Sequence, residues 1–117
     1  SYAFIKCSAL TTITIPNSVT TIEDNAFVYC SSLTSVTIPE GVTSIGLQAF
    51  QYCYELRNIY CYPLEVPGLG VGAFYAVNEN CTIHVPSQVL GDYRTHYSWM
   101  EYAKMMKAPF MRCFFIM

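Results

Sequence analysis

A repeat of 23 residues is the feature that most constrains the fold of this chain. Apolar or special residues follow Phe27 at fixed distances, and the same pattern lies 23 residues earlier and 23 residues later. The central copy comprises Phe27, Cys30, Leu33, Val36, Ile38, Pro39, Val42 and Ile45. The preceding copy begins at Phe4, and the following copy begins at Phe50 and becomes irregular after Cys61. A unit this short cannot bury its own apolar face, so the repeat predicts a solenoid in which successive units stack.

The composition fits one compact domain and argues against two classes of partner. Of the 117 residues, 53% are hydrophobic and 12% are charged, which is far from the composition of a disordered chain. The formal charge is −2 and the basic residues are scattered, so we expect no nucleic-acid interface. No apolar stretch approaches the ~20 residues that a membrane-spanning helix needs, so we expect no membrane span in this chain.

The segment that ends in proline has the alternation of a strand. Val36 and Ile38 alternate with Ser35 and Thr37, which places the first pair in the core and the second pair on the surface. Pro39 ends the strand because proline has no N–H to donate to a neighbouring strand. One such strand in every repeat predicts a short parallel sheet along the solenoid.

Two further elements are expected in each coil. Residues 42–45 are short and β-rich, and they predict a second brief strand on another side of the coil. Ala49 and Phe50 are expected to lie in a helical turn that fills the third side. In the fourth repeat, residues 67–72 contain one proline and three glycines, so we expect a loop there in place of the second strand.

The repeat from Leu33 to Cys53 resembles the BspA-type leucine-rich repeat. The shared pattern is Leu-Thr-Ser-Val-Thr-Ile-Pro, followed by Val-Thr-Ser-Ile-Gly and then by Ala-Phe. The likeness is close from residue 1 to about residue 62 and continues in degraded form to Pro86. It implies an α/β repeat solenoid, a right-handed leucine-rich-repeat coil with a short parallel sheet and a C-terminal capping helix.

The resemblance also implies how this single structural domain is divided. Residues 1–80 are expected to form about three and a half repeats of 23 to 24 residues, and residues 81–117 a C-terminal cap. Ser87, which follows Pro86, is the expected N-cap of the capping helix. The apolar positions of that helix are Val89, Tyr93, Tyr97 and Met100. We expect the apolar residues 109–117 to form a last strand beneath the cap, and self-association through them is the alternative.

The cysteines are placed as core residues and not as a disulfide framework. Cys7, Cys30 and Cys53 hold one repeat position, so stacked units bring them into a ladder. Cysteine is among the residues most often buried as a small hydrophobe, and we therefore expect free thiols. A bridge between neighbouring members of the ladder remains the alternative. Cys61 and Cys81 lie in different registers and are not expected to pair.

No group of residues in the sequence indicates catalysis, a metal site or a cofactor. His84 and His96 lie on different elements, and neither C-x-x-C nor H-x-x-x-H spacing occurs. The glycines at 68, 70 and 72 are not followed by the lysine of a phosphate-binding loop. His84 falls on the exposed face of a strand, whereas the cysteines nearby point inward, so a Cys–His nucleophilic pair is not expected.

The outer face of the strands is the remaining candidate site. The repeat predicts two outward rows of side chains, Thr12, Ser35, Asn58, Thr82 and Thr14, Thr37, Tyr60, His84. Threonine and serine in such rows are usually strand formers that face water. Aromatic side chains with a polar tip are favoured at interfaces, so the change of composition near the cap suggests a contact surface. The predicted ligand-binding residues are Asn58, Tyr60, Tyr62, Thr82, His84, Thr37, Ser35 and Thr14.

The resemblance implies a non-enzymatic protein-binding or adhesion module of a cell-surface or secreted protein. Its expected partners are host or matrix proteins, or other cell-surface proteins. A structural spacer and an accessory domain of a larger extracellular enzyme are the alternatives. Four strands offer a face of roughly 300 Å², compared with about 800 Å² per partner in a standard interface. Because the chain also begins inside a repeat, we expect it to be the C-terminal end of a longer array.

Overall fold

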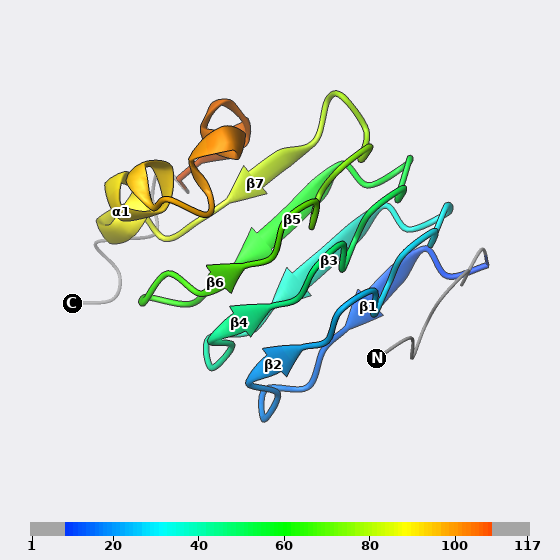
Figure 1. The fold of residues 1–117 in the computed structure, drawn as a ribbon, viewed down its shortest axis with the longest axis horizontal. Helices are drawn as coiled ribbons and strands as arrows, with labels where there is room; N and C mark the ends of the chain where they lie inside the picture. Colours follow the sequence, from blue (N-terminus) through cyan, green and yellow to red (C-terminus); the bar gives the residue numbers. More distant parts are fainter. Residues whose placement is uncertain (1–8, 109–117) are drawn as a thin grey trace.

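The computed structural model describes residues 9–108, which form a solenoid of stacked coils (Figure 1). Every strand pair is parallel, and the strands make up two sheets on different sides of the coils. In spatial order, the first sheet contains β1 (Thr12–Thr14), β3 (Ser35–Ile38), β5 (Asn58–Cys61), β7 (Thr82–His84) and β8 (Met106–Lys107). The second contains β2 (Thr21–Ile22), β4 (Ser44–Ile45) and β6 (Gly68–Leu69). The predicted solenoid with short parallel strands is confirmed.

The register of the first sheet follows the sequence repeat. Ile13 pairs with Val36, Val36 with Ile59, Ile59 with Ile83, and Ile83 with Met106. From Val36 onward these side chains are almost completely buried between adjacent coils. Burial of one such side chain contributes about 1.5–3 kcal/mol, so the repeated position supplies much of the driving force for stacking.

A column of aromatic rings fills the interior between the two sheets and the turns. The rings of Phe27 and Phe50 are stacked with their centroids 5.1 Å apart, and those of Phe50 and Phe74 are stacked at 5.7 Å. The column continues into the cap, where the Trp99 ring lies 5.8 Å from that of Phe74. The phenylalanine of each repeat therefore contacts its equivalents in the neighbouring coils.

The third side of the coils consists of turns, and the helical turn expected at Ala49 and Phe50 is wrong. Gln48 and Tyr52, on either side, have φ angles of 55° and 65° in the left-handed region, which a helix does not use. The N–H of Phe50 donates to the carbonyl oxygen of Ala73 in the next coil at 2.8 Å. Hydrogen bonds between coils thus alternate with bonds inside single turns, such as the one from the N–H of Ala49 to the carbonyl oxygen of Gly46 at 3.3 Å, while Ala49 and Phe50 are buried as expected.

The loop expected over residues 67–72 is also wrong, because these residues contain β6. Gly68 donates its N–H to the carbonyl of Thr43 at 3.0 Å, and Gly70 donates to that of Ile45 at 2.7 Å. The preceding coil presents these carbonyl acceptors even to glycine, which has a low strand propensity. The tertiary contacts therefore outweigh the strand propensity of the segment.

The predicted C-terminal helix is confirmed, and it is one of three short helical segments that build the cap. They are the 3₁₀ helix η1 (Ser87–Val89), the α-helix α1 (Leu90–Thr95) and the 3₁₀ helix η2 (Met100–Met105). Ser87 is the first residue of η1 and Pro86 holds the N-cap position, so the predicted Ser87 cap is wrong. In Figure 1 the cap covers the end of the solenoid beside β7.

Burial in the cap does not follow the helical stripe that we predicted. Tyr97 and Met100 are 83% and 56% exposed, because the α-helix ends at Thr95 and the next residue has an extended ψ of 133°. The buried residues are Tyr93 and Trp99. Tyr93 donates its O–H to the carbonyl of Pro63, and Trp99 donates Nε1–H to that of Pro67, both at 2.7 Å. Two aromatic anchors therefore dock the cap on the loop between β5 and β6.

The sheet continues beneath the cap through β8. Val85 donates its N–H to the carbonyl of Lys107 at 2.9 Å, and Arg94 donates to the carbonyl of Met106 at 3.0 Å. The strand or self-association predicted for residues 109–117 lies outside the described residues. Within residues 9–108, no helix has the length and apolar character needed to cross a bilayer.

Candidate functional site

The sheet register brings the predicted surface residues into two rows. Thr37 pairs with Tyr60 and Tyr60 with His84, and Lys107 of β8 extends this row by one position. The parallel row contains Ser35, Asn58 and Thr82, and Thr14 lies beside Thr37 on β1. The rows therefore run across the strands, from the first coil toward the cap.

Tyr60 and His84 form a stacked pair at the cap end of the sheet. Their ring centroids are 4.6 Å apart and the ring planes differ by 13°. A hydrogen bond of 2.9 Å joins His84 Nε2 to Asn58 Oδ1 on the neighbouring strand. Burial lowers the pKa of His84, and the nearby Lys107 ammonium lowers it further, so the imidazole is neutral at pH 7. The pair is thus held in place by stacking and by the bond to Asn58.

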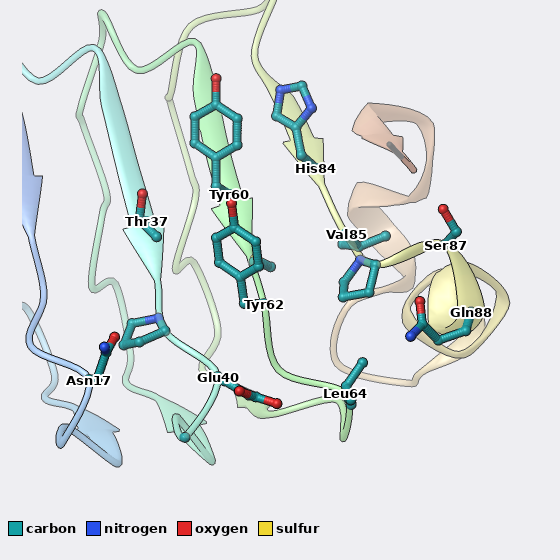
Figure 2. A pocket seen from close by; sticks show the side chains of 14 residues that line it. Asn17, Thr37, Glu40, Tyr60, Tyr62, Leu64, His84, Val85, Ser87 and Gln88 are labelled. Carbon is teal, nitrogen blue, oxygen red and sulfur yellow. The ribbon is translucent and has the colours of Figure 1, made fainter. Parts of the chain in front are cut away.

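A groove of about 840 Å³ lies where the strands of the first sheet end, next to the cap (Figure 2). Tyr60 and His84 border it on the sheet side, and Tyr62, which directly follows β5, stands within it. Tyr62 is 47% exposed. The remaining lining residues come from the first three coils and the cap: Asn17, Thr37, Pro39, Glu40, Gly41, Cys61, Leu64, Val85, Pro86, Ser87 and Gln88.

Only part of the predicted site faces this groove. Thr37, Tyr60, Tyr62 and His84 line it, and Asn58 acts through its hydrogen bond to His84. The other predicted residues, Ser35, Thr82 and Thr14, lie on the strands and outside the groove.

The residues that follow the prolines at the strand ends also line the groove and were not among the predicted site residues. The residue after the proline that ends each strand lines the groove in all four coils: Asn17, Glu40, Leu64 and Ser87. The 23-residue repeat places Glu40 opposite Asn17, but in the third coil the proline comes one residue later, so Leu64 is shifted by one position from that register. The signal was missed because the strand pattern was followed only as far as the proline.

The groove has the chemistry of a binding site and lacks an activated nucleophile. Burial, and then the neighbouring Cys81 thiol, raise the pKa of the Cys61 thiol far above its usual range. Burial likewise raises the pKa of Cys53 and of Cys81 to about 12. The thiolate is the reactive form, so these cysteines are inert core residues. In the described part of the chain, no three His, Cys, Asp or Glu side chains gather as a metal site would require.

The comparisons with known proteins agree with this architecture. The family model described as "BspA type Leucine rich repeat region (6 copies)" matches residues 1–104. A search of curated proteins gave no match to this chain. Leucine-rich-repeat domains are typically protein-binding modules and usually have no catalytic role. Repeats of the BspA type are typical of bacterial surface proteins. Since the match covers most of its length, the chain belongs to the family of BspA-type leucine-rich repeat regions.

Proposed function

We propose that this chain is a non-enzymatic adhesion module of a cell-surface or secreted protein. Its partners are host or matrix proteins, or other cell-surface proteins. The observation that carries the proposal is the aromatic groove beside the cap, in which Tyr62 stands next to the Tyr60–His84 pair. Exposed tyrosines beside a concave surface are typical of protein interfaces, because the ring buries apolar area while the hydroxyl remains hydrogen-bonded.

The groove also enlarges the contact area that the small sheet face offers to a partner. Strands of two to four residues give a flat surface well below the ~800 Å² that one partner contributes to a standard interface. The groove adds walls from the strand ends and from η1, so a partner segment contacts several elements at once. We therefore place the main contact at the groove, with the rows of threonine and serine at its rim.

The test measures binding of the intact chain to a panel of purified matrix and cell-surface proteins by biolayer interferometry. Tyr62→Ala, and the double variant Tyr60→Thr with His84→Thr, should each weaken any binding by about tenfold or more. The matched control is Tyr97→Ala, which removes a more exposed tyrosine outside the groove.

Three outcomes decide the proposal. Selective loss in the groove variants supports it. Binding that all variants retain, or that Tyr97→Ala weakens equally, would remove the groove as the site. If the folded wild-type chain binds none of the proteins tested, a structural spacer or an accessory domain is favoured.

A further inference from the structure

The groove has features that define the chemistry of its ligand. We propose that it binds an extended, proline-rich peptide segment of the partner, with one basic side chain placed against Glu40. This inference rests on the proposed function and identifies the kind of segment that the same groove recognises.

The shape of the groove favours an extended chain. Asn17 follows the first strand of the sheet and Gln88 lies beyond the fourth, so the lining crosses three strand intervals (Figure 2). At ~4.8 Å per interval, the groove is about 14 Å long. This length suits about four residues of an extended peptide at ~3.4 Å each. The peptide would run across the strands and not along them.

The walls favour side-chain contacts over backbone pairing. Pro39 and Pro86 end their strands at the groove, and neither has an N–H to offer a peptide backbone. The apolar lining comes from these rings together with Tyr60, Tyr62 and Leu64. A polyproline II segment makes no internal hydrogen bonds and binds aromatic-lined grooves through its side chains, so it fits these walls.

The charge of the groove favours a basic residue on the ligand. Glu40 is the one Asp, Glu, Lys or Arg side chain in the lining, and burial lowers the pKa of the lining His84. Glu40 is exposed, and among residues 9–108 it forms no ion pair. At the other end, Lys107 pairs with His84 across the sheet and repels a cation. The ligand's basic residue is therefore placed at the Glu40 end and away from the cap.

The experiment uses fluorescence anisotropy with the whole chain and three labelled peptides. The peptides are Pro-Pro-Leu-Pro-Pro-Arg and its versions with Gln or Glu in place of Arg. Affinity should fall by about threefold at each step from Arg to Gln to Glu, the size expected for an exposed charge pair. The differences should shrink in high salt, which screens exposed charges.

Variants separate the charge contact from the apolar contacts. Glu40→Gln should abolish the preference for Arg while binding of the Gln peptide is retained, and Glu40→Lys should reverse the order of the peptides. Tyr62→Ala should weaken all three peptides by about tenfold. Glu79→Gln, which removes an exposed carboxylate outside the groove, is the matched control and should change nothing. Thermal unfolding establishes that each variant is folded.

The outcomes also separate this inference from the proposed function. Equal binding of the Arg and Glu peptides, or an Arg preference that survives Glu40→Gln, overturns the inference. So does the absence of peptide binding at millimolar concentration. If panel proteins bind in a manner sensitive to Tyr62→Ala while the peptides do not, the inference fails and the adhesion proposal stands. If the peptides bind as expected and no panel protein binds, the adhesion proposal fails instead.

Discussion

At two equivalent positions, individual residues adopt a left-handed backbone conformation that is unfavourable in free energy. Two positions per coil have left-handed φ angles, one represented by Asn25, Gln48 and Gly72, the other by Tyr29, Tyr52 and Ala76. This region costs most non-glycine residues about 1–2 kcal/mol. At the second position, Tyr29 and Tyr52 stack with centroids 4.6 Å apart, a contact that offsets part of the cost. Ala76 has the same φ of 63° and no ring to stack.

Ala76→Gly should therefore stabilise the protein by about 0.5 kcal/mol. Glycine removes the left-handed penalty, and the greater freedom of the unfolded chain cancels part of that gain. Urea denaturation measures the change. The matched control is Ala103→Gly in η2, which should destabilise by about 0.5–1 kcal/mol because the backbone there is helical. Destabilisation by both substitutions would contradict this account of Ala76.

His84 should make the free energy of unfolding depend on pH in the acidic range. Burial and then Lys107 lower its pKa below 6.5, and the groups that face it are Tyr60, Asn58 and Lys107. As pH falls below 6.5, the unfolded chain binds a proton at this histidine more readily than the folded chain does. The free energy of unfolding should therefore fall in that range, and His84 should contribute no pH dependence well above it.

Urea midpoints measured from about pH 5 to pH 7.5 test this direction. By linkage, the slope of the free energy of unfolding against pH depends on the difference in protons bound by the unfolded and folded states. His84→Asn should flatten the acid side of the curve. His96→Asn, which replaces the other histidine, should leave the His84 contribution in place. A wild-type slope that persists in His84→Asn would assign the effect to another group.

Among the elements, β6 shows how closely the coils approach. Gly70 directly follows β6, and a Cβ on it would overlap the backbone nitrogen of Leu47 and lie 2.5 Å from the carbonyl carbon of Gly46. Backbone atoms cannot move aside as a flexible side chain can. At Gly68, the first residue of β6, an added Cβ would meet no atom within 4 Å. Glycine is therefore needed for packing at position 70 and not at position 68.

Gly70→Ala should destabilise the protein by about 1–3 kcal/mol, or more if the coils cannot separate, because the added methyl overpacks the second sheet. Gly68→Ala is its matched control and should change the free energy of unfolding by less than about 0.5 kcal/mol. Chemical denaturation of the two variants gives the comparison. Similar losses in both would indicate a general requirement for glycine at these two positions and not a steric one.

Across the whole molecule, the stabilising interactions should be mainly those between neighbouring coils. The phenylalanine column places Phe50 between Phe27 and Phe74, with the stacking contacts described above. In a solenoid each unit contacts only its neighbours, so the energetic coupling of two units should fall sharply with their separation.

A set of double-mutant cycles with Phe→Leu substitutions tests this organisation. The Phe27/Phe50 and Phe50/Phe74 pairs should each show a coupling energy of about 0.5–1.5 kcal/mol, the range for aromatic pairs in contact. The Phe27/Phe74 pair should be additive within about 0.5 kcal/mol. Equal coupling in all three pairs would show that the core responds as one unit.

The sequence alone predicted the elements that depend on the repeat. The pairing of Ile13, Val36 and Ile59, and the position of His84 beside Tyr60, follow from the spacing, because stacked coils of equal length align equivalent residues. The division into repeats to residue 80 and a cap from residue 81 stays a prediction. So does the role of the surface residues near the cap.

Only the tertiary structure decided the elements in segments that depart from the sequence pattern of the repeat. β6 forms in a glycine-rich segment because β4 supplies its hydrogen-bond acceptors, and β8 forms because β7 leaves an edge to pair with. In the cap, Trp99 is buried and Tyr97 exposed because the carbonyl of Pro67 accepts the indole N–H. The spacing of apolar residues in the sequence predicts the periodic core. The ends of the strands, the cap and the groove depend instead on contacts between segments that the repeat does not relate.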